Sequence, residues 1–237
     1  YSNYLVYKIL EEAGVPKGVI QFVPSLAEEV VGTAINNKNF ASLHFTGSSV
    51  VFRKLWKQIS NNLDFYRGYP RIVGETGGKN FHFVHKSANP DAVVTQSVRG
   101  AFEYQGQKCS ALSRLYVPKS MWEGVLKDKL LSATKSIRMG PVNEFEHFMG
   151  PVVAKNSFDK IMGLIEAAKK EGGKVLIGGS GDDSTGYYIE PTIIETDVYN
   201  SVTMVQEIFG PVITVFPYPD DDIEQTCALV DSTTEYA

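Results

Sequence analysis

The sequence has little cysteine: only Cys109 and Cys227 occur among its 237 residues. Two thiols cannot build the disulfide framework of a small secreted protein, so a reducing compartment is expected. No apolar run approaches the roughly 18 residues of a membrane span, which argues against a membrane protein. The net charge of −4 provides no basic surface, so neither nucleic acid nor anionic lipid is expected as a partner. No charged and then apolar leader follows Tyr1, so any targeting peptide is expected upstream or already removed.

The chain does have an ordinary globular composition, with 43% apolar and 21% charged residues. Its apolar patterns and turn residues predict strands at 18–24, 41–48, 70–75, 80–85, 174–179, 187–194 and 211–218. They predict helices at 4–13, 26–35, 49–60, 90–104, 121–137, 158–170 and 221–232. Strands that alternate with helices indicate an α/β fold with parallel sheets.

Capping residues predict where two of these helices begin. Asn89 precedes Pro90, and proline is well tolerated in a first helical turn because its missing N–H has no partner there. Ser120 and Glu123 have the S-x-x-E spacing of a capping box, so they are expected to start the following helix.

The segment FTGSS, residues 45–49, stands where a predicted strand ends and a helix begins. Gly47 lets the backbone approach a bound group, and the free N–H groups of a helix start suit a pyrophosphate. Ser48 adds a hydroxyl donor. A serine-capped turn without a ligand is the alternative. The full G-x-G-x-x-G fingerprint is absent, because Phe52 stands where a third small residue is expected.

The segment GETGGKN, residues 74–80, places a carboxylate beside two glycines. Glu75 follows a predicted strand, and a carboxylate on such a flexible elbow can act as a general base. An exposed glutamate in a surface turn is the alternative.

Cys109 lies in the polar segment QGQKCSA. The start of a short helix is expected there, and it would favour the thiolate together with the neighbouring Lys108. Ser110 and Ala111 leave space for a substrate. A buried structural cysteine is the alternative, and the polar neighbours argue against it.

Cys227 has a different environment in the segment IEQTCALV. On a helix it would share a face with Ile223 and Val230, so it is predicted to lie in the core.

The segment EIFGPV, residues 207–212, places a carboxylate and an aromatic ring just ahead of a strand. Glu207 can bond ribose hydroxyls, and the Phe209 ring can pack against a flat cofactor. A loop in which Phe209 fills the core is the alternative.

In this order, the four segments resemble the successive signature segments of the NAD(P)-dependent aldehyde dehydrogenase superfamily over essentially the whole chain. The segments YRGYPRIVGETGGKNFHFVH and FEYQGQKCSA resemble the branch that oxidises glutamate γ-semialdehyde, which forms from pyrroline-5-carboxylate, to glutamate in proline catabolism. Thr76 in ETGGK fits that branch. The resemblance implies NAD-dependent oxidation of this aldehyde substrate to a carboxylate through a cysteine thiohemiacetal and a thioester.

The resemblance also implies a role for each candidate residue. Cys109 would be the nucleophile, and its backbone N–H would be an oxyanion donor. Glu75 would activate the hydrolytic water, and Ser110 would help bind the carboxylate end of the substrate. Glu207 would hold the nicotinamide ribose, with Phe209 near the ring. The pyrophosphate would be lined by Thr46, Gly47, Ser48, Ser49, Val50 and Val51. No metal is implied.

The same resemblance implies how the whole enzyme is organised. Residues 1–75 would be the second half of a Rossmann-like cofactor domain, and residues 76–237 most of the catalytic domain. The chain resembles the middle of a larger enzyme. In that family an oxyanion asparagine lies upstream, and the loop that anchors the substrate carboxylate lies downstream. The full-length enzyme would be a homodimer or higher homo-oligomer, in the mitochondrial matrix or otherwise in the cytoplasm.

Two other functions stay open from the residues alone. A cysteine acyltransferase or hydrolase without NAD would need a histidine base. His82 and His85 point to opposite faces of a predicted strand, and His44 and His147 lie in no motif. No Cys–His spacing typical of a zinc site occurs either. The other possibility is a non-catalytic module that has kept the fold.

Overall fold

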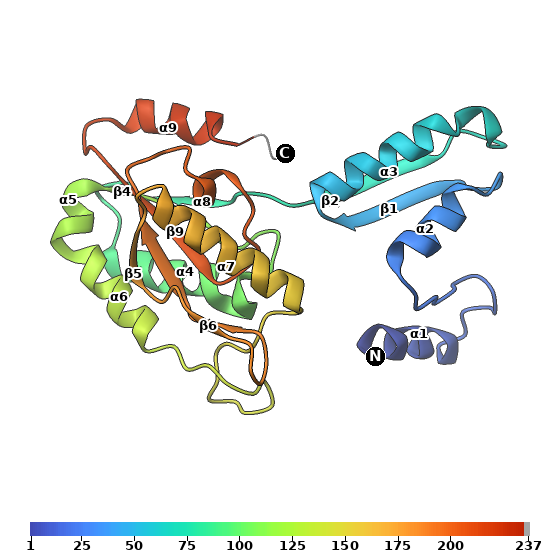
Figure 1. Ribbon diagram of the computed structural model, residues 1–237, viewed down its shortest axis with the longest axis horizontal. Helices are drawn as coiled ribbons and strands as arrows, with labels where there is room; N and C mark the ends of the chain where they lie inside the picture. Colours follow the sequence, from blue (N-terminus) through green and yellow to red (C-terminus); the bar gives the residue numbers. More distant parts are fainter. Residues whose placement is uncertain (235–237) are drawn as a thin grey trace. The chain divides into compact units, whose positions relative to one another are not determined.

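The computed structural model describes residues 1–234 (Figure 1). The chain divides into two compact units, and the division falls between Thr76 and Gly77, within the segment GETGGKN. Among the described residues, no helix has both the length and the apolar character needed to cross a bilayer.

The first unit is built around one parallel strand pair. Strand β1 (Ser42–Gly47) leads into α3 (Ser49–Asn61), and the chain returns through η1 (Leu63–Phe65) to β2 (Arg71–Thr76) beside β1. Two further helices precede this β–α–β motif: α1 (Ser2–Glu12) and α2 (Ala27–Ile35). The small core of the unit consists of Ile35, Leu55, Ile59 and Tyr66.

The predicted strand at 18–24 is wrong. Only an isolated bridge between Lys17 and Ile20 forms in this region. A strand needs a hydrogen-bonded neighbour, and β1 and β2 pair only with each other in the described part of this unit.

The second unit contains a five-stranded sheet in the order β3-β4-β9-β8-β5. Neighbouring strands are parallel except for β5, which runs antiparallel to β8. The strands are β3 (Phe81–Phe83), β4 (Arg114–Pro118), β5 (Lys174–Ile177), β8 (Thr192–Glu195) and β9 (Val212–Tyr218), with a small hairpin of β6 (Gly181–Asp182) and β7 (Tyr188–Ile189). The helices are α4 (Pro90–Phe102), η2 (Glu103–Gly106), α5 (Lys119–Met121), the π-helix η3 (Trp122–Leu126), α6 (Lys127–Lys135), α7 (Lys155–Lys170), α8 (Val202–Val205) and α9 (Ile223–Ser232).

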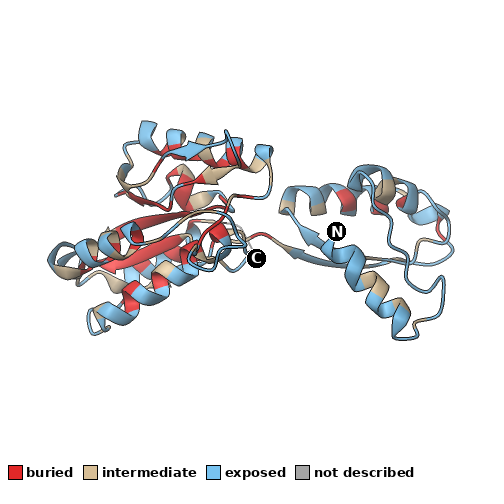
Figure 2. Cartoon of the chain, turned by 90° about the horizontal axis from the view of Figure 1, so that it is seen from below, coloured by how far each residue is buried: buried red, intermediate tan, exposed pale blue. Residues whose placement is uncertain are grey.

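Both faces of this sheet are covered, as the alternation of side chains along β4 shows. Leu115 and Val117 pack into the core cluster formed with α4, η3 and α6. Tyr116, between them, packs into a different cluster with residues of β9 and α9. The strands are accordingly buried between helices in Figure 2. The predicted α/β fold with parallel strands is confirmed, because a sheet buried on both faces is typical of that class.

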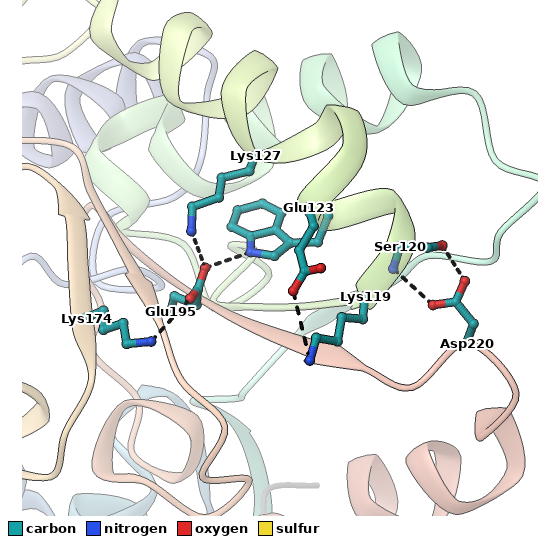
Figure 3. Close-up of polar contacts among 8 residues, drawn as sticks. Lys119, Ser120, Glu123, Lys127, Lys174, Glu195 and Asp220 are labelled. Atoms are coloured by element: carbon teal, nitrogen blue, oxygen red, sulfur yellow. Dashed lines mark hydrogen bonds and ion pairs between the residues drawn. The ribbon is translucent and has the colours of Figure 1, made fainter.

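The two capping predictions have different outcomes. The side chain of Asn89 accepts two N–H groups of the first turn of α4, at 3.0 and 3.1 Å, so this cap is confirmed. The capping box is wrong, because Ser120 lies inside a helix that begins at Lys119. The backbone N–H and the hydroxyl of Ser120 donate to Asp220, which follows β9 (Figure 3). Glu123 instead lies 3.9 Å from Lys119.

Glu195, at the end of β8, braces the sheet against η3 and α6 (Figure 3). Its Oε2 accepts the indole N–H of Trp122 at 2.7 Å and the ammonium of Lys127 at 2.8 Å. Burial raises the pKa of Glu195, but the hydrogen bonds from Lys127 and Trp122 outweigh it, and the net pKa is lowered. The ionised carboxylate therefore stabilises the folded chain.

Glu195→Gln in the complete polypeptide is expected to lower the free energy of unfolding at pH 7 by about 1–2 kcal/mol, because hydrogen bonds to a charged group are lost. A lowered pKa in the folded state gives stability above the ordinary pKa of the carboxyl, and it is lost as pH falls through the lowered value. The difference between the variants should therefore shrink in acid. Chemical denaturation at several pH values measures it. Glu123→Gln, whose ion pair is exposed, should change little; equal effects of the two changes would contradict the bracing role.

Candidate active site

Cys109 lies in an exposed turn between η2 and β4. The N–H of Ala111 closes this turn on the carbonyl of Lys108 at 3.0 Å. The helix expected to start at Cys109 is absent, because the chain turns directly into β4. The Lys108 ammonium bonds Glu103 at 2.9 Å, so the thiolate activation predicted from these two features has no support in the structure. The exposure of Cys109 nevertheless excludes the alternative of a buried structural cysteine.

Asn80 fixes the backbone of Cys109, and the sequence did not single it out. Its side-chain N–H donates to the carbonyl of Cys109. Its own carbonyl accepts the N–H groups of Ser113 at 3.3 Å and Arg114 at 3.2 Å. The end of GETGGKN and the segment around Cys109 are therefore held together from both sides. Its place as the last residue of the GETGGKN segment was the only feature of the sequence that could have indicated a role for Asn80.

The turn that precedes Cys109 is left-handed. Tyr104, Gln105 and Gly106 have φ angles of 54°, 58° and 65°. Two consecutive non-glycine residues in this region store strain, which tends to occur at functional sites. Gly106 also has no room for a side chain, because a Cβ there would lie 2.2 Å from the carbonyl oxygen of Gly210. The turn therefore rests directly on the EIFGPV segment.

Two glutamines anchor this turn to the segment that follows Gly150. The side-chain N–H of buried Gln105 donates to the carbonyl of Pro151 at 3.0 Å. The side-chain oxygen of Gln107 accepts the N–H of Val153 at 2.9 Å. These bonds give the strained turn a single geometry and thereby fix the approach to Cys109.

Glu207 contacts the glycines of GETGGKN. Its Oε1 accepts the N–H of Gly78 at 3.2 Å. A Cβ on Gly77 would lie 2.1 Å from Oε2, so any other residue at this position would displace the carboxylate. Lys160 on α7 donates to the Glu207 carbonyl at 2.8 Å. Glu207 and Cys109 are thus both bonded to the 78–80 segment.

Phe209 lies outside the core. It is 41% exposed and has a φ of 57°, whereas the preceding Ile208 is 2% exposed and packs with α7. The alternative in which Phe209 fills the core is therefore wrong. Its ring is available to a ligand, and Ser110, beside Cys109, is exposed as well.

Glu75 is the fifth residue of β2 rather than part of a loop, and its backbone pairs with Thr46. The flexible elbow predicted at Glu75 is therefore wrong, although its side chain is exposed. Gly74 explains why Phe52 stands where a small residue was expected. A Cβ on Gly74 would lie 2.2 Å from the Phe52 ring, so the glycine makes room for that aromatic side chain.

The start of α3 fits an anionic group such as a pyrophosphate. Ser48 precedes the helix, but its side chain makes no capping hydrogen bond, so the ligand-free serine cap is not supported. The hydroxyl of Ser49 is buried without a hydrogen-bond partner among the described residues. An orphaned hydroxyl beside the free N–H groups of a helix start offers the donors that such a group requires. Thr46 and Gly47 end β1, and Val50 and Val51 are exposed in the first turn.

Cys227 is exposed on α9, so its predicted place in the core is wrong. The buried residues of this helix are Thr226 and Val230. On a helix of 3.6 residues per turn, Cys227 is rotated about 100° from buried Thr226 and therefore lies off the buried face. Together with Asn80 and Phe81 it lines a cavity of about 670 Å³.

The histidines give no support to a hydrolase. His82 is paired with Ser97 at 3.2 Å, and His85, beyond the end of β3, with Ser87 at 2.8 Å. Burial lowers the pKa of His82. Within residues 1–234 no hydrogen bond joins a histidine to Cys109. Exposed Glu144 and Glu146 and partly buried His147 have ligand atoms within 4.8 Å of one another, and nothing else in the described residues around them indicates a metal.

Known proteins of one family are similar to this chain over nearly its whole length. The model of the aldehyde dehydrogenase family matches residues 1–236. Delta-1-pyrroline-5-carboxylate dehydrogenase of Agaricus bisporus is 60% identical over 236 residues, which are 100% of this chain and 43% of that protein. The mitochondrial delta-1-pyrroline-5-carboxylate dehydrogenase of Danio rerio is 48% identical over an aligned length of 238, and the alignment covers 100% of this chain and 43% of that protein.

Solved structures give the same result. The Delta-pyrroline-5-carboxylate dehydrogenase of Mycobacterium tuberculosis bound with NAD matches with a TM-score of 0.92 and 39% identity, over 99% of this chain and 43% of that one. The 1-pyrroline-5-carboxylate dehydrogenase from Thermus with bound NAD matches with a TM-score of 0.90 and 31% identity, over 98% of this chain and 44% of that one. The chain thus spans less than half the length of these relatives. Because the family model matches nearly every residue, the chain belongs to the aldehyde dehydrogenase family.

Proposed function

We propose that the protein oxidises an aldehyde to a carboxylate with NAD, and that the aldehyde is glutamate γ-semialdehyde, which yields glutamate. The observation that carries this proposal is the clustering of exposed Cys109, the 78–80 segment and Glu207 in one hydrogen-bonded group. The name of the Agaricus bisporus relative supports the choice of substrate, and the NAD-bound structure of the Mycobacterium tuberculosis relative supports the choice of cofactor.

In the proposed reaction, the Cys109 thiolate attacks the aldehyde carbon and forms a thiohemiacetal. The backbone N–H of Cys109 stabilises the oxyanion, in a turn that Asn80 fixes. The hydride on the former aldehyde carbon would pass to NAD, when NAD is bound, and the loss of that hydride converts the thiohemiacetal into a thioester. The thioester then left on Cys109 is hydrolysed by a water from which Glu75 takes a proton, and the products are the free carboxylate and the regenerated thiol.

The remaining site residues bind and orient. The end of β1 and the start of α3 hold the pyrophosphate through Thr46, Gly47, Ser48, Ser49, Val50 and Val51. Glu207 bonds the nicotinamide ribose, and Phe209 packs near the ring. Ser110 contacts the carboxylate end of the substrate.

The proposal extends to the organisation of the whole enzyme. Residues 1–75 belong to the cofactor domain and residues 76–237 to the catalytic domain. The complete enzyme is a homo-oligomer, and it is placed in the mitochondrial matrix because several relatives are named as mitochondrial.

The direct test supplies the complete polypeptide with NAD and pyrroline-5-carboxylate, and follows NADH by its fluorescence. NADH formation that requires the aldehyde is expected. Thioester hydrolysis without NAD dependence would favour the hydrolase, and binding of neither NAD nor aldehyde would favour a non-catalytic module.

Glu75→Gln is expected to slow deacylation by about 100-fold or more while acylation continues, because only the second step needs an activated water. Rapid mixing should show a burst of NADH close to one per site, followed by slow turnover. Glu28→Gln, an exposed change in the same unit, should leave both phases unchanged. Loss of the burst itself would show that Glu75 acts on the thiol instead.

A further inference from the structure

Lys79 is a charged side chain that the proposed reaction does not use, and it is only 4% exposed. An ammonium withdrawn from water carries a large free-energy penalty unless it is paired. Its Nζ donates to the carbonyl of Thr203 at 2.8 Å, in the short helix α8. Because α8 leads directly into Gln206 and Glu207, this bond fixes the segment that carries the Glu207 carboxylate.

A second bond links the same two segments. Gly78, which precedes Lys79, donates its N–H to Oε1 of Glu207 at 3.2 Å. The adjacent residues Gly78 and Lys79 thus bond two points, Glu207 and Thr203, of the segment that runs from α8 to Glu207. Two separated bonds prevent a rotation that either bond alone would allow, so the carboxylate has a defined position rather than a range of positions.

The backbone of Lys79 is itself held by the sheet. The guanidinium of buried Arg114 donates through Nε, at 3.0 Å, and through Nη2 to the Lys79 carbonyl. The connection therefore runs from the sheet, through Arg114 on β4 and Lys79, to α8 and Glu207. Such a chain of buried bonds transmits the rigidity of the sheet to the carboxylate.

The surroundings of Lys79 bring the pKa of its ammonium into the neutral pH range. Burial, together with the positive charges of Arg114 and Lys160, lowers its pKa to about 7, although the Glu207 carboxylate opposes this shift. The ammonium is therefore present below about pH 7 and is lost as the pH rises above that value. Of the two protonation states of Lys79, only the charged ammonium attracts the Glu207 carboxylate.

We propose that Lys79 is a positioning residue, which holds the carboxylate of Glu207 where it can bond the nicotinamide ribose. The inference rests on the proposed function, because that function assigns the ribose contact to Glu207. It adds a buried cation as the support of that contact.

The test uses Lys79→Met, Glu207→Gln and the double variant of the complete polypeptide. Binding of NADH and of AMP is measured by calorimetry, and hydride transfer by single-turnover kinetics. Lys79→Met should weaken NADH binding and slow hydride transfer by about 10- to 100-fold, because a misplaced carboxylate loses its geometry. AMP lacks the nicotinamide ribose, so its binding should be unchanged. The double variant should be no worse than Glu207→Gln alone, because Lys79 acts through Glu207.

A matched control is Lys169→Met, an exposed lysine on α7 paired with Glu166, which should change none of these quantities. Additive effects in the double variant, or an equal loss of AMP binding, would overturn the positioning role of Lys79. A Glu207→Gln variant with unchanged NADH binding and hydride transfer would instead show that the ribose assignment, and with it the proposed function of Glu207, is wrong.

A pH series on the unmodified enzyme tests the inference without any change at Lys79. NADH binding should weaken relative to AMP binding as the pH rises, with a midpoint near the lowered pKa of about 7. The Glu207→Gln variant should lack this dependence. An identical pH dependence in that variant would mean that Lys79 does not act through Glu207.

Discussion

Cys109→Ala in the complete polypeptide is expected to reduce the proposed aldehyde oxidation by roughly 10⁴- to 10⁶-fold, the scale on which enzymes lose rate when a catalytic nucleophile is removed. Alanine keeps the small volume of the turn but cannot form the thiohemiacetal. The turn should survive, because Asn80 bonds the backbone carbonyl of Cys109 rather than its side chain. NADH formation with pyrroline-5-carboxylate measures the loss, and calorimetry should show unchanged binding of NAD.

Cys227→Ala is the matched control, because both thiols are exposed. Cys227 lies on α9 and takes no part in the proposed reaction, so oxidation should continue at the unmodified rate. The stability should change by no more than about 0.5 kcal/mol, as for most surface substitutions. If Cys227→Ala removed activity as completely as Cys109→Ala, the nucleophile would have been assigned to the wrong thiol.

The elements that the sequence predicts well are those specified by local patterns. The apolar stripe of α7 and the Asn89 cap depend on residues within one or two turns, and both are found. The Ser120 cap failed because its partner, Asp220, is distant in the sequence. A motif read locally cannot reveal such a competitor. The absent strand at 18–24 has a similar cause, because strand formation depends on a neighbour elsewhere in the chain.

The candidate site shows the same limit. Segment order and family resemblance selected Cys109, Glu75 and Glu207 as candidates, and their roles stay predictions. The surroundings of Cys109 were not predicted, since three consecutive left-handed residues precede it and the expected helix does not form. That conformation is imposed by contacts with Gly210 and with the segment after Gly150, which no local preference encodes. The sequence did not identify Asn80 and Lys79 because their hydrogen-bond partners, Cys109 and Thr203, are distant in the sequence.

Gly106→Ala is expected to have the largest effect on stability, although it adds only one methyl group. The new Cβ would lie 2.2 Å from the oxygen and 2.7 Å from the carbon of the Gly210 carbonyl, and 2.8 Å from the carbonyl oxygen of Ala101. These are backbone atoms of two different segments, so no side chain can rotate away. The φ of 65° adds the strain of a left-handed residue. The free energy of unfolding should fall by about 3 kcal/mol or more, from overpacking and from the left-handed backbone together.

The same change should impair the chemistry, because the 103–106 turn leads directly into Cys109 and rests on the segment that carries Glu207. A shift of about 1 Å between reacting groups can cost about 100-fold in rate, so turnover should fall even at temperatures where the variant stays folded. Denaturant titration and single-turnover kinetics measure the two effects separately.

Gly163→Ala is the control for this prediction. Gly163 lies within α7, and a Cβ there would meet no other described part of the chain within 4 Å. Alanine at this position should therefore stabilise the helix by about 0.5–1 kcal/mol. If Gly106→Ala unfolded and turned over like Gly163→Ala, the close backbone contact between Gly106 and Gly210 could not be what fixes the geometry of the Cys109 turn.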